Sequence, residues 1–138
     1  MTKIVDYRNV LVTRNDLIVL KDVTFSLESG EFAYLIGKVG SGKSSLMKTM
    51  YAEVPIDEGE AIVLDYSVSD IKRKHIPFLR RQIGIVFQDF QLLTDRSAHD
   101  NLEFVLRATG WTDKAAIAER IEEVLTRVGM VKKSYKMP

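Results

Sequence analysis

The sequence has no cysteine, and its 138 residues include three prolines and one tryptophan. Without cysteine the chain cannot form a disulfide scaffold, a thiolate metal site or a cysteine nucleophile, and its composition fits a reducing compartment. An excess of one charge is also missing, because 20 Lys and Arg balance 19 Asp and Glu to a net charge of +1. That balance excludes the strongly basic character of proteins that live on nucleic acid or anionic lipid. We therefore expect no nucleic-acid partner.

Long hydrophobic runs are absent as well. The longest, such as residues 32–36, fall far short of the roughly 18 apolar residues that span a bilayer. The N-terminus carries an early acid, Asp6, and no apolar stretch of signal-peptide length, so we expect a cytoplasmic chain. With 46% hydrophobic residues, the chain has material for one core and is too short for two ordinary domains.

The chain does contain short strand-like and helix-like segments in alternation. Residues 31–36 and 83–87 are almost continuously apolar, which is typical of strands buried on both faces of a parallel sheet. The sequence contains only two segments of this buried type, which are too few for a complete parallel sheet, so we expect the sheet to be incomplete. Further strands are predicted over residues 4–12, 23–27 and 61–64, with turns at Asn15-Asp16 and Glu58-Gly59.

Apolar residues at helical spacing predict four helices. The first covers residues 44–52 and the second covers residues 76–81, where Pro77 suits a helix start. The third begins after an N-cap at Ser97 and ends near Gly110. The fourth is capped by Thr112 or Asp113 and ends at Gly129, and its predicted apolar face consists of Ile117, Ile121, Val124, Leu125 and Val128.

One motif carries specific chemistry. Residues 37–44, GKVGSGKS, match G-x-x-x-x-G-K-[ST] and lie between an apolar strand and an amphipathic helix. Glycines let the backbone turn its N–H groups inward around an anion, and the helix start adds the positive end of its dipole. A mere connecting turn is the alternative, and the flanking context argues against it. The residues predicted to bind nucleotide phosphate are Gly37, Lys38, Val39, Gly40, Ser41, Gly42, Lys43, Ser44 and Ser45.

Two side chains of this loop have more specific roles, and a third residue follows the next strand. Lys43 is placed to reach the β- and γ-phosphates, and the Ser44 hydroxyl to complete a Mg²⁺ shell. Gln88 directly follows residues 83–87, at the strand end where α/β sheets bind ligands. An amide can ligate Mg²⁺ or orient water, although an ordinary strand-end glutamine is the commoner case.

Together these motifs resemble the N-terminal half of an ABC-transporter ATPase domain. Residues 85–97, IVFQDFQLLTDRS, followed by DNL at 100–102, are similar to the cell-division FtsE branch, and also to the lipoprotein-release and macrolide-export ATPases. The resemblance implies an α/β P-loop NTPase fold of the ABC ATPase type. It also implies that residues 1–138 are the N-terminal part of a single nucleotide-binding domain. Residues 1–96 would be the P-loop core and β subdomain, and residues 97–138 the start of the helical subdomain.

The resemblance also implies roles and partners. Residues 37–44 would bind ATP, Lys43 and Gln88 would serve catalysis in the complete protein, and Ser44 and Gln88 would hold Mg²⁺. Residues 89–102 would contact an integral membrane partner resembling FtsX. The complete protein is then expected to be a homodimeric ATPase on the inner face of the cell membrane, coupling ATP binding and hydrolysis to that partner.

Several family features are not found in these 138 residues. There is no LSGGQ-type signature, no apolar strand ending in Asp-Glu and no switch histidine, since His75 and His99 come too early. We therefore expect nucleotide binding at most, without useful hydrolysis, from this chain. A non-hydrolytic regulatory chain and the N-terminal lobe of an SMC-like ATPase remain alternatives. The aromatic residue that stacks on adenine is also missing, and Tyr7, its nearest substitute, is more typical of packing.

A basic stretch has two interpretations. Residues 71–88 contain no acid and carry Lys72, Arg73, Lys74, Arg80 and Arg81. A solvated helix face is one interpretation, and contact with anionic lipid headgroups is the other. Nearby Asp65 and Asp70 are interpreted as turn residues rather than metal ligands.

Overall fold

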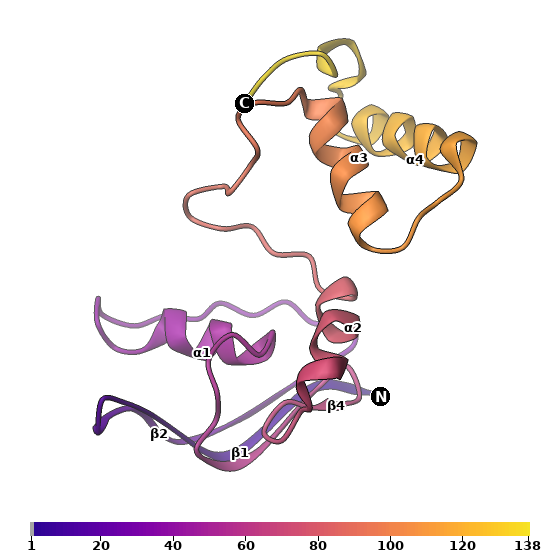
Figure 1. Cartoon of the computed structure of the whole chain (residues 1–138). Coiled ribbons are helices and arrows are strands. Elements are labelled where there is room, and N and C mark those ends of the chain that lie inside the picture. The colour runs from indigo at the N-terminus through magenta and orange to yellow at the C-terminus, as the bar shows by residue number, and fades with distance from the viewer. Residues whose placement is uncertain (1) are drawn as a thin grey trace. The chain divides into compact units, whose positions relative to one another are not determined.

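The structure is a computed structural model that describes residues 2–138. Contacts divide the chain into two compact units, Met1–Gly84 and Ile85–Pro138, which we call unit 1 and unit 2. Unit 1 holds the sheet and two helices, and unit 2 holds a helical hairpin (Figure 1). The predicted division at residues 96 and 97 concerns the subdomains of a complete nucleotide-binding domain and stays a prediction.

Unit 1 is built on a long hairpin. β1 (Lys3–Arg14) and β2 (Leu17–Glu28) pair antiparallel around a tight turn at Asn15 and Asp16, whose φ angles are 51° and 63°. This confirms the predicted turn, because asparagine and aspartate tolerate the left-handed region better than other residues do. β3 (Glu58–Val63) and β4 (Tyr66–Ser67) complete an antiparallel sheet in the order β2-β1-β3-β4.

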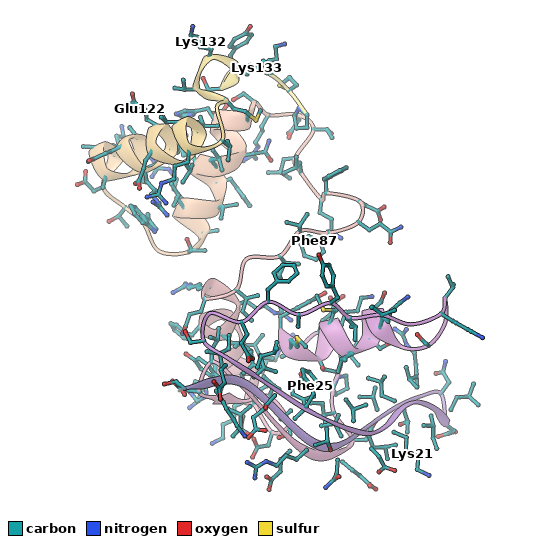
Figure 2. The ribbon with its side chains drawn as sticks, turned by 180° about the vertical axis from the view of Figure 1, so that it is seen from behind. Lys21, Phe25, Phe87, Glu122, Lys132 and Lys133 are labelled. Atoms are coloured by element: carbon teal, nitrogen blue, oxygen red, sulfur yellow. The ribbon has the colours of Figure 1, made fainter. Side chains whose placement is uncertain are left out.

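The core of unit 1 lies between the sheet and two helices. Buried side chains alternate with exposed or half-buried ones in each half of β1, as expected of a strand covered on one face, and the alternation shifts by one residue at Arg8 and Asn9. α1 (Lys43–Met50) lies over that face and contributes Leu46, and α2 (Ile76–Arg81) contributes the fully buried Leu79 (Figure 1). Phe25 of β2 lies in the space between the sheet and α1, its ring centroid 5.0 Å from that of Tyr7 (Figure 2).

Both predicted parallel strands are wrong for this structure. Residues 31–36 and 83–87 belong to no strand, and Ile36 and Val86 are 89% and 91% exposed. A parallel strand becomes regular when a neighbouring strand pairs with its N–H and C=O groups and helices cover its faces. The described residues supply neither to these segments. The α/β class and the incomplete sheet hold, but the sheet that forms is antiparallel.

Gly59 has a different role from the predicted one. It lies inside β3 with φ of +92°, not in a turn before the strand. A Cβ at Gly59 would stand 2.4 Å from the carbonyl oxygen of Asn9 and 2.6 Å from that of Arg8. The glycine therefore lets β3 approach β1 at the point where the register shifts between Arg8 and Leu11.

The predicted turn at Asp65 is confirmed. Leu64 and Asp65 have φ angles of 49° and 68°, and they join β3 to β4 as a two-residue hairpin loop. The structure thus gives Asp65 the role of a turn residue.

Unit 2 is a pair of helices, α3 (Ala98–Ala108) and α4 (Lys114–Arg127), that pack together. The predicted caps are confirmed: the Ser97 side chain accepts from Asp100 N at 3.1 Å, and that of Asp113 from Ala115 N at 3.0 Å. Buried Ile117, Ile121 and Leu125 form the core with Leu102 and Leu106. Val128, predicted on this apolar face, lies past the helix end and is exposed.

Short 3-10 turns flank the helices of both units. One, Arg73–His75, leads directly into α2, which spans the predicted residues, and the other, Val131–Lys133, follows α4. In unit 2, the carbonyl oxygens of Ser134 and Lys136 accept hydrogen bonds from His99 N and Ala98 N, both at 2.8 Å. The tail thus satisfies N–H groups at the start of α3, which have no partner inside the helix. No helix in the described part of the chain has the length and apolar character needed to cross a membrane.

Candidate functional site

The glycine-rich loop leads directly into α1 in unit 1. Gly40 and Gly42 have φ angles of +83° and +98°, and Gly42 is the N-cap of α1. Both values lie in the left-handed region, which side chains with a Cβ rarely adopt. The glycines at these two positions are therefore required by the backbone path of the loop.

Contacts with β2 hold the end of the loop. A Cβ at Gly42 would stand 2.7 Å from Leu20 Cδ2 and 3.0 Å from the carbonyl oxygen of Val19. A Cβ at Gly37 would stand 2.6 Å from the Ser41 hydroxyl oxygen, and Ser41 N donates to the carbonyl oxygen of Lys38 at 3.0 Å. The loop is thus tightly wound and lies directly against the hairpin strand.

Lys43 reaches back across the loop. Its ammonium donates a hydrogen bond to the carbonyl oxygen of Gly37, six residues earlier. A flexible ammonium held this way is free to exchange a carbonyl for a phosphate oxygen, which is a charged and stronger acceptor. The structure thus brings together the two ends of the predicted phosphate loop.

The first turn of α1 leaves backbone donors available. Leu46 N donates to the carbonyl oxygen of Gly42 at 2.9 Å, which makes it the first N–H bonded within the helix. The N–H groups of Lys43, Ser44 and Ser45 come before it and have no acceptor inside the helix. Together with the helix dipole, they fit an anion with several oxygens, such as a phosphate.

The remaining loop side chains lie at the surface. Lys38, Val39 and Ser44 are exposed, and Ser45 is half-buried. An exposed hydroxyl at Ser44, one residue past Lys43, is a hard oxygen ligand of the kind that Mg²⁺ prefers. Their exposure is compatible with the predicted roles of these residues, which stay predictions.

Gln88 belongs to unit 2, whereas the loop belongs to unit 1. Its side chain is exposed, in the segment that joins α2 to α3. Gln88 and Ser44 thus lie in separately described units, and the Mg²⁺ that they are predicted to share remains a prediction.

Asn101 fixes the segment after Gln88, a role that motif reasoning missed. Its Oδ1 accepts from Leu93 N at 2.8 Å, and its Nδ2 donates to the carbonyl oxygens of Leu93 and Ser97, both at 3.0 Å, and of Arg96 at 3.3 Å. An amide that both donates and accepts can clamp a loop in this way. The signal was an asparagine early in a predicted helix, a position where such side chains bond to nearby backbone.

Tyr7 is not available for stacking on adenine. It is fully buried, and its hydroxyl shares a 2.8 Å hydrogen bond with Thr49 Oγ1. Burial raises the pKa of Tyr7 to about 12, partly offset by the bond to Thr49. Tyr7 is thus a core residue, and it is removed as a candidate for base recognition.

The two histidines stand apart from the loop in the sequence. His75 is exposed, and His99 is half-buried with Nδ1 3.2 Å from Asp100 Oδ1. A carboxylate oxygen of Glu103 lies within 4.8 Å of a ring nitrogen of His99 and a carboxylate oxygen of Asp100. The Glu103 carboxylate already accepts two hydrogen bonds from Arg107, at 3.1 and 3.2 Å. These contacts fit solvated polar groups better than a metal site.

The amino-acid sequence is similar to those of known proteins that belong to one family. The family model described as ABC transporter matches residues 20–138. FtsE, the cell division ATP-binding protein of Streptococcus pneumoniae serotype 2, is 37% identical over 124 residues, which are 90% of this chain and 54% of that protein. FtsE of Mycobacterium tuberculosis is 39% identical over 120 residues, 86% of this chain and 51% of that protein. The chain therefore spans about half the length of the curated relatives it matches.

Solved structures show the same relationship. MJ0796, a dimeric bacterial ABC transporter cassette, has a TM-score of 0.83 at 27% identity over 97% of this chain and 61% of that one. The cbiO1 protein of Clostridium perfringens, part of an ABC transporter complex, has a TM-score of 0.87 at 26% identity over 99% of this chain and 55% of that one. Because the family model matches residues 20–138, the chain belongs to the ABC transporter family, and it resembles FtsE.

Proposed function

We propose that this chain is the ATP-binding part of a subunit resembling FtsE, whose complete protein couples ATP binding and hydrolysis to a membrane partner. The observation that carries the proposal is the loop itself. Left-handed Gly42 caps α1, and the Lys43 ammonium lies across the loop on the carbonyl oxygen of Gly37. Similarity to FtsE over 90% of the chain supports the choice of branch.

ATP would be held mainly by backbone. The free N–H groups at the start of α1 would donate to phosphate oxygens, and Lys43 would leave Gly37 to pair with the β- and γ-phosphates. Mg²⁺ would neutralise phosphate charge, with the exposed Ser44 hydroxyl as one ligand and Gln88 as another in the complete protein. Because the Asp-Glu and signature motifs are not in these residues, we propose binding without turnover for the 138-residue chain.

Calorimetric titration of this chain with Mg-ATP tests the proposal. Lys43→Ala should weaken binding at least about tenfold, since a charge-assisted contact to phosphate is lost. Lys48→Ala removes the same charge from the last turn of α1 and should bind like the unmodified chain. Equal affinity in both variants, or no binding by a folded chain, would contradict the proposal. Phosphate release during the same incubation checks for turnover.

We further propose that residues 89–102 contact an integral membrane partner resembling FtsX. Phe90 and Leu92 present exposed apolar side chains, while the Asn101 clamp holds the following residues 93–97. A photoreactive residue at position 90 of the complete protein in cells should cross-link to an integral membrane protein. The same residue at Glu122, which is exposed on α4, should not. Cross-linking from position 122 but not from position 90 would place the partner contact on α4 and contradict the proposal.

Dimerisation and location belong to the complete protein. MJ0796 is a dimeric cassette by its description, and we propose the same arrangement for the complete relative of this chain, held at the inner face of the membrane through its partner. Sedimentation of the complete protein with and without ATP tests the dimer. A monomer under both conditions would contradict it.

A further inference from the structure

A group of basic residues gathers around α2 in unit 1. Lys72, Arg73, Lys74 and Arg81 are all exposed, and together with Phe78 we call them the basic segment. Residues 71–88 contain no acid. Among the ion pairs found in residues 2–138, none involves these four side chains. None of the four side chains is therefore held in a direct ion pair with a described residue.

The segment is fixed to the core from beneath. Leu79 is fully buried in the core of unit 1, and Ile71 and Ile83, on either side of the helix, pack against the same core. Arg80 has a structural role, because its Nε donates to the carbonyl oxygen of Tyr51 at 2.8 Å at the end of α1. The basic segment is thus the outward side of a firmly attached element.

The position of these charges does not help the helix. Lys72, Arg73 and Lys74 precede α2, and the first turn of α2 contains no acid. Positive charge at a helix N-terminus opposes the helix dipole, whereas Arg81 at the other end agrees with it. Arg73 and Lys74 suit the end of their own 3-10 turn, but the dipole of α2 gives no reason for Lys72, Arg73 and Lys74 to gather before it, which leaves room for a partner outside the chain.

Phe78 adds an apolar group among the charges. Its ring is 51% exposed, and the guanidinium of Arg81 lies 5.0 Å from its centroid. An exposed aromatic ring between cationic side chains suits the boundary between lipid headgroups and acyl chains, where the ring enters and the charges stay at the headgroups. A partner that is recognised by charge alone gives no reason for this ring.

We propose that the basic segment binds the surface of a bilayer that contains anionic phospholipid. The net charge of +1 gives the whole chain little attraction for such a surface, so the local cluster and Phe78 supply it. This property goes beyond ATP binding and does not require it. Its test therefore contains no nucleotide, and a failed phosphate loop would leave the result unchanged.

Co-sedimentation with phosphatidylcholine vesicles containing about 30% phosphatidylserine tests the proposal. One basic residue near an anionic surface is worth about a fivefold change in partitioning, so Lys72→Gln, Arg73→Gln and Lys74→Gln together should reduce it about 100-fold. Phe78→Ser should cause a smaller loss, roughly threefold to tenfold. Binding should also fall at high salt and vanish on vesicles of phosphatidylcholine alone.

The matched control removes the same number of positive charges from another part of the chain. Lys132 and Lys133 lie in the tail of unit 2 (Figure 2), and both are exposed, as is Lys136. Replacing these three lysines by glutamine gives the same net charge as the first triple variant. This control should bind vesicles like the unmodified chain. Equal loss in both triple variants would show attraction by net charge alone and would overturn the proposal.

Two further results would overturn it. The first is equal binding to vesicles with and without phosphatidylserine. The second is retention of the chain on immobilised poly-glutamate without binding to vesicles, which would assign the segment to an acidic protein. Circular dichroism of each variant confirms that the fold is kept.

Discussion

The two units each hold one irregular segment in place, and they do so by different means. In unit 1, backbone conformation sets residues 37–44, since Gly40 and Gly42 adopt left-handed angles and the loop rests on β2. In unit 2, a single side chain holds residues 93–97 in place. Asn101 makes four hydrogen bonds to backbone groups of this segment. A phosphate loop must present bare N–H groups, so side chains cannot occupy its interior. Residues 93–97 have no such limit, and the Asn101 side chain suffices to hold them.

The units also differ in the size of their cores. Among residues 2–138, nine buried hydrophobic residues form the cluster of unit 1, and three form that of unit 2. Stability should therefore be uneven along the chain, with unit 2 opening more easily.

Truncating the small core should have the largest effect. Ile121 is fully buried, and Ile121→Ala should cost about 3–4 kcal/mol of stability, enough to unfold unit 2 while unit 1 remains protected. Hydrogen exchange resolved by residue checks this. Leu79→Ala, in the larger core, is the counterpart and should open unit 1 instead. Uniform loss of protection across both units in either variant would break the comparison.

Adding a methyl group to the loop should come next. Gly42→Ala combines a positive φ with contacts to Leu20 and Val19, so we expect about 2–3 kcal/mol of destabilisation and loss of Mg-ATP binding. Gly30→Ala is the control, with φ of +86° and no atom near the added Cβ, and should cost about 1 kcal/mol. Urea unfolding and calorimetry measure both. Equal effects would mean that the contact with β2 does not matter.

Removing the clamp should have a moderate effect. Asn101→Ala loses four hydrogen bonds at a half-buried site, and we expect about 2 kcal/mol of destabilisation confined to unit 2. Exchange of the Leu93 amide should accelerate most, since its acceptor is lost. Thr112→Ala, at an exposed position, should change stability by less than about 0.5 kcal/mol. An unchanged Leu93 amide would show that the loop holds without the clamp.

Removing the buried hydroxyl should have the smallest effect at neutral pH. Tyr7→Phe loses one hydrogen bond, while Thr49 Oγ1 keeps its bond to the carbonyl oxygen of Leu46, so we expect a cost of about 1 kcal/mol. The pKa of Tyr7 is raised from 10.0 to about 12 in the folded chain, so its neutral form contributes stability that is present below pH 10 and lost as the pH rises through 12.

The free energy of unfolding in urea, measured from pH 8 to 12 for the unmodified chain and for Tyr7→Phe, isolates the contribution of Tyr7. The other tyrosines titrate in both proteins, so their effect cancels in the difference. The unmodified chain should lose more stability than Tyr7→Phe above pH 10. Parallel curves would show that Tyr7 is not buried in solution.

Features that depend on a few neighbouring backbone groups could be predicted from the sequence. The turn at Asn15-Asp16, the caps at Ser97 and Asp113 and the bounds of α2 were read from residue type and spacing, because each depends on a few neighbouring backbone groups. The loop at residues 37–44 was predictable for the same reason. Gly59 was misread as a turn, since its cause is the carbonyl oxygens of Arg8 and Asn9, some fifty residues away.

By itself, the sequence determined where the glycine-rich loop and the helices lie, because glycine spacing and helical periodicity are local codes, while the family followed from the resemblance of its motifs to known proteins. The tertiary structure decided which apolar segments became strands: residues 31–36 have the composition of a buried strand, yet they remain unpaired and exposed. A strand exists only where another strand accepts its hydrogen bonds, and no property of the segment itself supplies that partner. The same holds for Tyr7, whose removal from base recognition followed from burial against Thr49 rather than from its place in the chain.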